Sequence, residues 1–71
     1  MNTGEKSVCR FDGPTARHYV EVVQLDSEQY RVYRVQPFPP PTRGDKVERF
    51  DVDGGYLAAI NLGAHLVREA W

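Results

Sequence analysis

Cysteine, histidine and serine, which often carry catalysis or bind metals, are few in this sequence and far apart, and its ten acidic residues form no recognisable motif. Cys9 is the only cysteine, and the two histidines, His18 and His65, lie in different halves of the chain. A zinc site needs several ligands, and a nucleophile needs a base beside it. Ser7 and Ser27 lack the glycines of a nucleophile elbow. The sequence therefore predicts no enzyme activity, metal site or cofactor, and we expect Cys9 to be a small buried apolar residue.

Residues 51–55 begin like a calcium-binding loop, with carboxylates at the first and third positions. The pattern then stops, because Tyr56 stands where such a loop needs glycine and Leu62 stands where it needs a bidentate glutamate. Asp53 instead precedes a helical pattern, and an aspartate there can accept hydrogen bonds from the free N–H groups of the first turn. We therefore expect Asp53 to be a helix N-cap.

A proline-rich segment links two runs with strand character. Residues 34–40 match the R-x-x-P-x-x-P spacing of ligands that bind aromatic grooves. Arg34, however, belongs to the preceding run, so the motif is not free to lie in a groove. Proline donates no backbone hydrogen bond, and we expect residues 37–44 to form a rigid polyproline II connector that turns at its end.

Four runs have the composition of strands. Eight of the nine valines lie at or before Val52, and β-branched residues suit the pleated surface of a sheet. The predicted strands span residues 7–11, 17–25, 30–37 and 46–52. The last of them is dense in charge, which is typical of a sheet edge.

The second and third strands read as a hairpin. We expect Leu25 to lie opposite Tyr30 and Glu21 opposite Arg34, an ion pair across the ladder that stabilises it by roughly 0.2–1 kcal/mol. In this register Val20 and Val22 share the core face with Val35 and Tyr33.

From Gly54 or Tyr56 onward the chain has a helical pattern, in which small and straight-chain apolar residues replace the valines. One stripe at helical spacing contains Tyr56, Ala59, Ile60, Gly63, Leu66 and Val67. The sequence thus predicts an α+β fold, a small antiparallel sheet of four strands in the order β-β-β-β-α with one C-terminal helix packed across it. Residues 7–71 form a single domain, and residues 1–6 are expected to be a flexible tail.

Gly63 is the unusual residue of this helix, because glycine costs about 1 kcal/mol there relative to alanine. Close packing against another backbone would explain it, and Ala59 makes a small-xxx-small pair with it. The sheet of the same chain could supply that backbone. Leu62 widens the apolar surface beyond what one sheet face needs, so we also expect that Ala59, Leu62 and Gly63 could form the interface of a homodimer.

Composition limits the possible partners. The chain has 71 residues and a net charge of −1, whereas a sequence-independent nucleic-acid binder needs a basic surplus. No apolar run reaches the roughly 18 residues of a membrane span, and the N-terminus lacks the apolar region of a signal peptide. We therefore expect a cytoplasmic protein that does not associate with membranes.

The functional hypothesis is a small non-enzymatic protein-binding module. Its most specific form is an inhibitor or regulator from a phage or mobile element, of the anti-CRISPR or anti-defence type, that acts by steric or allosteric block of a larger complex. Aromatic residues and arginines dominate many interfaces. The expected contact residues are Tyr30, Arg34, Phe38, Arg43 and Trp71.

Two alternatives belong to other classes. The first is a single-stranded nucleic-acid-binding protein, in which Tyr19 and Tyr30 share a sheet face with Arg34 and stack on unpaired bases. The second is a structural homo-oligomer assembled through the C-terminal helix.

Overall fold

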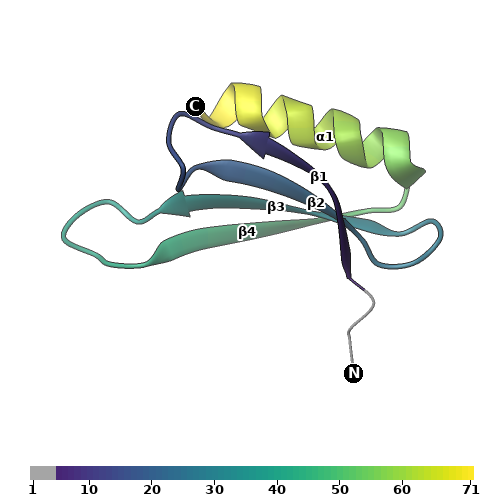
Figure 1. Ribbon diagram of the computed structural model, residues 1–71, viewed down its shortest axis with the longest axis horizontal. Helices are drawn as coiled ribbons and strands as arrows, with labels where there is room; N and C mark the ends of the chain where they lie inside the picture. Colours follow the sequence, from purple (N-terminus) through teal and green to yellow (C-terminus); the bar gives the residue numbers. More distant parts are fainter. Residues whose placement is uncertain (1–4) are drawn as a thin grey trace.

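The computed structural model describes residues 5–71, apart from the side chain of Ala70. Four strands are followed by one helix: β1 (Lys6–Asp12), β2 (Tyr19–Gln24), β3 (Tyr30–Pro37), β4 (Asp45–Val52) and α1 (Gly55–Ala70). The strands form one antiparallel sheet in the order β1-β2-β3-β4, and α1 crosses one face of it (Figure 1). The predicted β-β-β-β-α fold is confirmed. Of the expected tail, residues 1–4 lie outside the described residues, and Lys6 already belongs to β1.

The register of β2 and β3 differs by one residue from the predicted one. Leu25 N–H donates to the Gln29 carbonyl at 2.8 Å, so that only residues 26–28 form the turn. Val22 consequently lies opposite Val32, and Glu21 lies opposite Tyr33 rather than Arg34. The predicted Glu21–Arg34 pair is wrong, because a shift of one residue turns the side chains of β3 to the other face.

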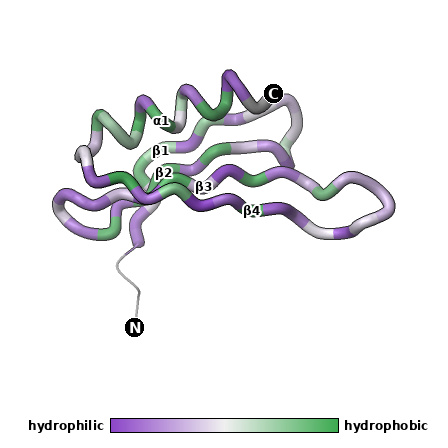
Figure 2. The backbone as a smooth tube through the Cα atoms, turned by 180° about the vertical axis from the view of Figure 1, so that it is seen from behind, coloured by the Kyte–Doolittle hydropathy of each residue, from purple (hydrophilic) through white to green (hydrophobic). Residues whose placement is uncertain are grey.

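The corrected register builds the core under α1. Val20, Val22 and Val32 are fully buried, and Tyr30, Ala59 and Leu66 complete the buried cluster. Val32 therefore takes the core position that the predicted register gave to Tyr33. Cys9 packs against this cluster, as its predicted apolar role requires, but it is half-buried rather than buried. Figure 2 shows the hydrophobic segments gathering where α1 crosses the sheet.

The loop between β3 and β4 is a folded turn rather than the expected polyproline II connector. Thr42 N–H donates to the Pro39 carbonyl at 3.1 Å around a cis peptide bond between Pro40 and Pro41. Such a turn differs from polyproline II, which has no internal hydrogen bonds. Phe38 N–H then donates to the carbonyl of Gly44, whose φ of 97° suits glycine, and the hairpin continues into β4.

The start of α1 also corrects a prediction. Gly54 is the N-cap residue, and no side chain makes a capping hydrogen bond, so Asp53 is not the cap. Gly55 follows with a φ of 86°, a conformation that favours glycine. The Gly54-Gly55 pair thus provides the sharp change of direction from β4 to α1, and backbone geometry replaces the predicted carboxylate.

The edge position predicted for the last strand is confirmed. β4 pairs only with β3, and its eight residues run without a bulge. The opposite edge strand, β1, has an irregularity between Ser7 and Cys9. Phe50 and Val52 of β4 pack against the core cluster, whereas the Val47 side chain is 53% exposed. Within residues 5–71, no helix is long and apolar enough to cross a membrane.

Candidate functional site

The face of the sheet opposite α1 is not covered by any element of the described chain (Figure 1). The register places alternate residues of each strand on this face, which we call the open face. Its members are Ser7, Arg10 and Asp12 of β1; Tyr19, Glu21 and Val23 of β2; Arg31, Tyr33, Val35 and Pro37 of β3; and Asp45, Val47, Arg49 and Asp51 of β4. The open face therefore combines tyrosine, arginine and valine side chains with acidic ones on one continuous surface.

Two valines of the open face are almost buried although no helix lies over them. Val23 is 6% exposed and Val35 is 7% exposed. Because no backbone layer covers this face, the larger side chains of neighbouring strands must shield them. Val35 lies opposite Tyr19 on β2 and opposite Val47 on β4. The open face is thus a packed side-chain layer with an apolar base.

Arg10 and Tyr19 form a stacked pair on this surface. The guanidinium carbon of Arg10 lies 3.9 Å from the centroid of the Tyr19 ring, a cation–π arrangement. Arg10 Nε also donates to Asp12 Oδ1 at 3.1 Å. These contacts hold the arginine flat against the sheet while its side chain remains 48% exposed.

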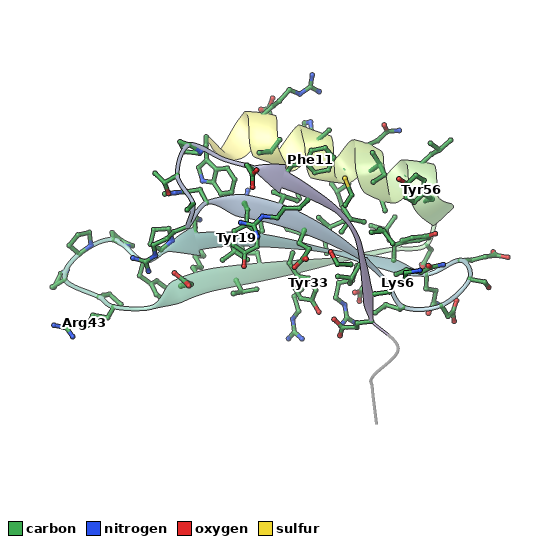
Figure 3. All side chains as sticks on the ribbon, viewed as in Figure 1. Lys6, Phe11, Tyr19, Tyr33, Arg43 and Tyr56 are labelled. Atoms are coloured by element: carbon green, nitrogen blue, oxygen red, sulfur yellow. The ribbon has the colours of Figure 1, made fainter. Side chains whose placement is uncertain are left out.

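A second group links β3 to β4 and to the residue before β1. Arg31 Nε donates to Asp51 Oδ1 at 2.7 Å, and Arg31 Nη1 lies 3.9 Å from Glu5 Oε2. The Tyr33 hydroxyl donates to Glu5 Oε1 at 3.2 Å, and Figure 3 shows Tyr33 on the side of the sheet away from α1. Hydrogen bonds with the neighbouring Tyr33 and Asp51 raise the pKa of Arg31 above its ordinary value.

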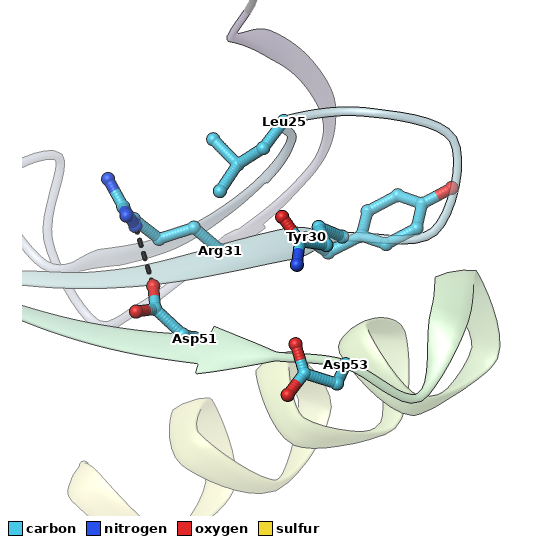
Figure 4. A pocket seen from close by; sticks show the side chains of 6 residues that line it. Leu25, Tyr30, Arg31, Asp51 and Asp53 are labelled. Carbon is cyan, nitrogen blue, oxygen red and sulfur yellow. Dashed lines mark hydrogen bonds and ion pairs between the residues drawn. The ribbon is translucent and has the colours of Figure 1, made fainter.

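A small pocket lies where the β2–β3 turn meets the end of β4 (Figure 4). It has a volume of about 120 Å³ and is lined by Leu25, Gln29, Tyr30, Arg31, Asp51 and Asp53. Pockets that bury small-molecule ligands usually measure about 300–1,000 Å³. The Arg31–Asp51 ion pair forms one wall, so the charged groups of this pocket largely satisfy each other. We therefore place the candidate site on the open face and not in this pocket.

Three of the five predicted contact residues serve the fold. Tyr30 is 7% exposed, and its ring meets that of Tyr56 edge-on with 6.0 Å between centroids. Arg34 Nε donates to Glu48 Oε1 at 2.8 Å, and the guanidinium lies above the Phe50 ring.

Trp71, the third of these residues, closes the end of the sheet. Its ring lies edge-on to His18 with 5.2 Å between centroids, and its Nε1 donates to Gln36 Oε1 at 3.1 Å. Only Phe38, which is 38% exposed, and Arg43 stay accessible, both on the β3–β4 loop. Figure 3 shows Arg43 at the tip of that loop, pointing away from the sheet.

The three predicted oligomer residues are used largely inside the chain. Ala59 is fully buried, and Leu62 is half-buried against the core cluster. A Cβ at Gly63 would lie 2.8 Å from Phe11 Cε2 and 3.2 Å from Val22 Cγ2. The sheet of the same chain therefore supplies the close neighbours of Gly63, and these are side chains rather than the predicted backbone. Among the described side chains of α1, the exposed large apolar ones are Tyr56 and Leu57, at its first turn.

The predicted nucleic-acid face is also corrected. Tyr19 lies on the open face, whereas Tyr30 and Arg34 point to the side of α1, so these residues do not share a surface. The sequence patterns did not identify Tyr33, Arg31 and Arg49 as members of the open face. Pairing Val22 with Val32 puts Tyr33 and Arg31 on that face. Arg49 follows from alternation along β4, where the neighbouring Phe50 faces the core.

No protein-family model, curated protein or solved structure matches this chain. Within the part of the chain that the structure describes, no group of three or more histidine, cysteine, aspartate or glutamate residues could hold a metal ion.

Proposed function

We propose that this chain is a non-catalytic module that binds a protein partner through its open face. The observation that carries the proposal is the one-sided cover of the sheet, which leaves Tyr19, Tyr33 and three arginines on an uncovered surface over buried valines. Tyrosine and arginine are enriched among the residues that dominate interface energetics. Because Arg10 and Arg31 are already held by contacts within the chain, binding would immobilise little additional side-chain freedom.

The charge of the open face favours a protein partner over a nucleic acid. Arg10, Arg31 and Arg49 lie among Glu5, Glu21 and Asp51, so positive and negative groups alternate across the surface. A phosphate backbone would be attracted by the arginines and repelled by the carboxylates. A protein surface with its own mixed charges can match both signs, which gives specificity.

The narrower hypothesis is that the module blocks a larger complex, as an inhibitor encoded by a phage or mobile element of the anti-CRISPR or anti-defence type. Its support is the small size of the chain and the absence of a catalytic constellation in its sequence. A rigid single domain of this size can cover a partner's surface without contributing chemistry. This origin and this mode of action stay predictions.

The experiment that tests the proposed function compares three forms of the full chain as baits in an extract of the cells that encode it. Wild type is compared with Tyr19→Ala/Tyr33→Ala, which removes both aromatic rings from the open face. Tyr56→Ala removes an exposed tyrosine from the helix side and serves as the matched control. We expect one partner, identified by mass spectrometry, to be retained by wild type and Tyr56→Ala and lost by the double variant.

Circular dichroism must first show that all three forms are folded. A partner that the double variant retains would place the site elsewhere on the molecule. Binding of a single-stranded oligonucleotide that weakens steeply with salt would instead support the nucleic-acid alternative.

A further inference from the structure

The outer edge of β4 carries a charge pattern that is complementary to itself. Around Val47, each charged residue has one of opposite sign at the same distance along the strand. Within β4 the pairs are Lys46 with Glu48 and Asp45 with Arg49. Asp51 has its counterpart in Arg43, which lies in the loop just before β4. Two β4 strands that pair antiparallel about Val47 would therefore place Lys46 opposite Glu48 and Asp45 opposite Arg49, and would bring Asp51 toward the loop that contains Arg43.

The backbone hydrogen-bonding pattern of β4 also favours antiparallel pairing centred on Val47. Phe38 N–H donates to the carbonyl of Gly44, its partner in the register, so these two residues are a hydrogen-bonded pair. Hydrogen-bonded and non-hydrogen-bonded pairs alternate along an antiparallel ladder. Counting from Gly44, the N–H and C=O groups of Asp45, Val47, Arg49 and Asp51 must point away from β3. A second strand centred on Val47 would meet these outward groups directly.

The cations of this edge are free to pair. Within the part of the chain that the structure describes, Arg43, Lys46 and Arg49 form no ion pair.

Within residues 5–71, the three acidic counterparts of these cations each keep one carboxylate oxygen available. Arg17 takes Oδ1 of Asp45, and Arg34 takes Oε1 of Glu48. Arg31 takes Oδ1 of Asp51. The second oxygen of each carboxylate can accept from another chain without loss of the internal pair, since an ionised carboxylate accepts several hydrogen bonds.

A two-fold axis at another residue of β4 would match the charges of the two strands much less well. A two-fold axis through Lys46, Glu48 or Arg49 would place two identical charges directly opposite each other, which is destabilising. An axis through Phe50 matches only Arg49 with Asp51. The centre at Val47 instead places two half-exposed valines side by side on the open face. Charges on an edge strand commonly prevent pairing with other chains, but this arrangement favours one register of pairing with a second copy.

We propose that the chain forms a two-fold symmetric dimer through antiparallel pairing of β4 with β4 of a second copy, centred on Val47. The axis stands perpendicular to the sheet, so the two sheets join into one and both helices lie on the same side. Figure 1 shows β4 as the strand farthest from α1, and α1 packs mainly on β2 and β3. The helix therefore leaves the edge accessible, and the two open faces become continuous.

Charge reversal tests the pairing on the full chain by sedimentation or light scattering across a concentration series. Wild type should approach twice its mass of 8.1 kDa at high concentration. Arg49→Glu places two acidic groups opposite each other at each symmetric site and should give a monomer, whereas Asp45→Arg/Arg49→Glu reverses the pair and should restore the dimer. Arg68→Glu changes the net charge equally on exposed α1 and should leave the dimer intact.

Disulfide trapping tests the register, in a Cys9→Ser background that leaves no other thiol. Cysteines that replace Val47 would face each other with Cα atoms about 5.5 Å apart, within reach of a disulfide. Cysteines that replace Arg49 would be offset along the strands by about 14 Å and out of reach. We expect Val47→Cys to form a cross-linked dimer under mild oxidation and Arg49→Cys to remain uncross-linked.

A wild-type chain that stays monomeric at the highest concentration would overturn the proposal. So would equal dimerisation of Arg49→Glu and Arg68→Glu, or more efficient cross-linking through position 49 than through position 47. The tyrosine substitutions that test the proposed function do not alter the backbone edge of β4. Failure of either proposal is therefore visible without failure of the other.

Discussion

At Gly63 a single hydrogen atom in place of a methyl group sets how closely α1 approaches the sheet. The space that a Cβ would need is already occupied by the ring of Phe11 and by Val22. The loss of helix propensity at this position, about 1 kcal/mol relative to alanine, is offset by this close packing. The residue therefore serves the internal interface between α1 and the strands β1 and β2.

We expect Gly63→Leu to destabilise the fold by about 1–3 kcal/mol, because the added atoms must displace Phe11 or lift the helix. Urea unfolding followed by circular dichroism measures the change in the free energy of unfolding. His65→Leu adds the same side chain at an exposed position of the same helix and should change stability little. Equal stability of the two variants would mean that Gly63 has room that the structure does not give it.

At the scale of elements, strand register decides which side chains meet. Because Leu25 pairs with Gln29, every residue of β3 is displaced by one position relative to the expected hairpin. Arg34 therefore lies opposite Val20 and not opposite Glu21. The register of β3 and β4 places Arg34 opposite Glu48, and the two form a half-buried ion pair with side chains 21% and 30% exposed. The neighbouring Phe50 ring covers one side of the guanidinium, which reduces screening by water.

We expect a double-mutant cycle with Arg34→Ala and Glu48→Ala to give a coupling energy of about 1 kcal/mol, measured by denaturant unfolding. The matched control is the cycle of Arg17 with Asp45, whose side chains are 59% and 47% exposed, and its coupling should be close to zero.

Charge reversals at Arg34, Glu48 and Glu21 test the register of β2 and β3. A charge reversal at Arg34 should lower the free energy of unfolding, and a second charge reversal at Glu48 should restore it, because the two side chains are in contact. Reversal of Glu21 should not rescue it, since Glu21 lies opposite Tyr33 on the open face. Rescue by Glu21 alone would show that the chain adopts the other register in solution.

At the scale of the whole molecule, one helix covers one face of a four-stranded sheet, so stability is concentrated in the centre. β2 and β3 are paired on both sides and contribute the three fully buried valines. The outer strands have one unpaired edge each, and β4 has the fewest contacts with α1. The two central strands and the middle of α1 should therefore be the last parts to open.

We expect amide hydrogen exchange to be slowest in β2 and β3 and fast at Asp45, Val47 and Arg49, whose N–H groups point outward. NMR on dilute protein, or on the Arg49→Glu variant, measures these rates without interference from self-association. At high concentration the outward amides of β4 in wild type should become protected, and the outer edge of β1 should not. Slow exchange at Val47 in dilute protein would contradict the assignment of β4 as an open edge.

The sequence by itself determined the order and type of the elements. The valines of residues 20–35 predicted strands, and the apolar stripe that contains Ala59 and Leu66 predicted the helix, because these patterns depend only on neighbouring residues. The charge density of β4 was enough to predict an edge. The charge symmetry about Val47 is also written in the sequence, but it acquires meaning only because β4 has an unpaired side.

The tertiary structure alone decided which face each residue of β3 occupies and which neighbour Gly63 meets. Both outcomes depend on contacts between residues far apart in the chain. A hairpin shift of one residue costs little in local propensity, yet it reverses every side chain of a strand. This shift placed Tyr30 and Arg34 on the side of α1 and Tyr33 on the open face. The fold class was therefore predictable from composition, whereas the candidate binding surface required the three-dimensional pairing.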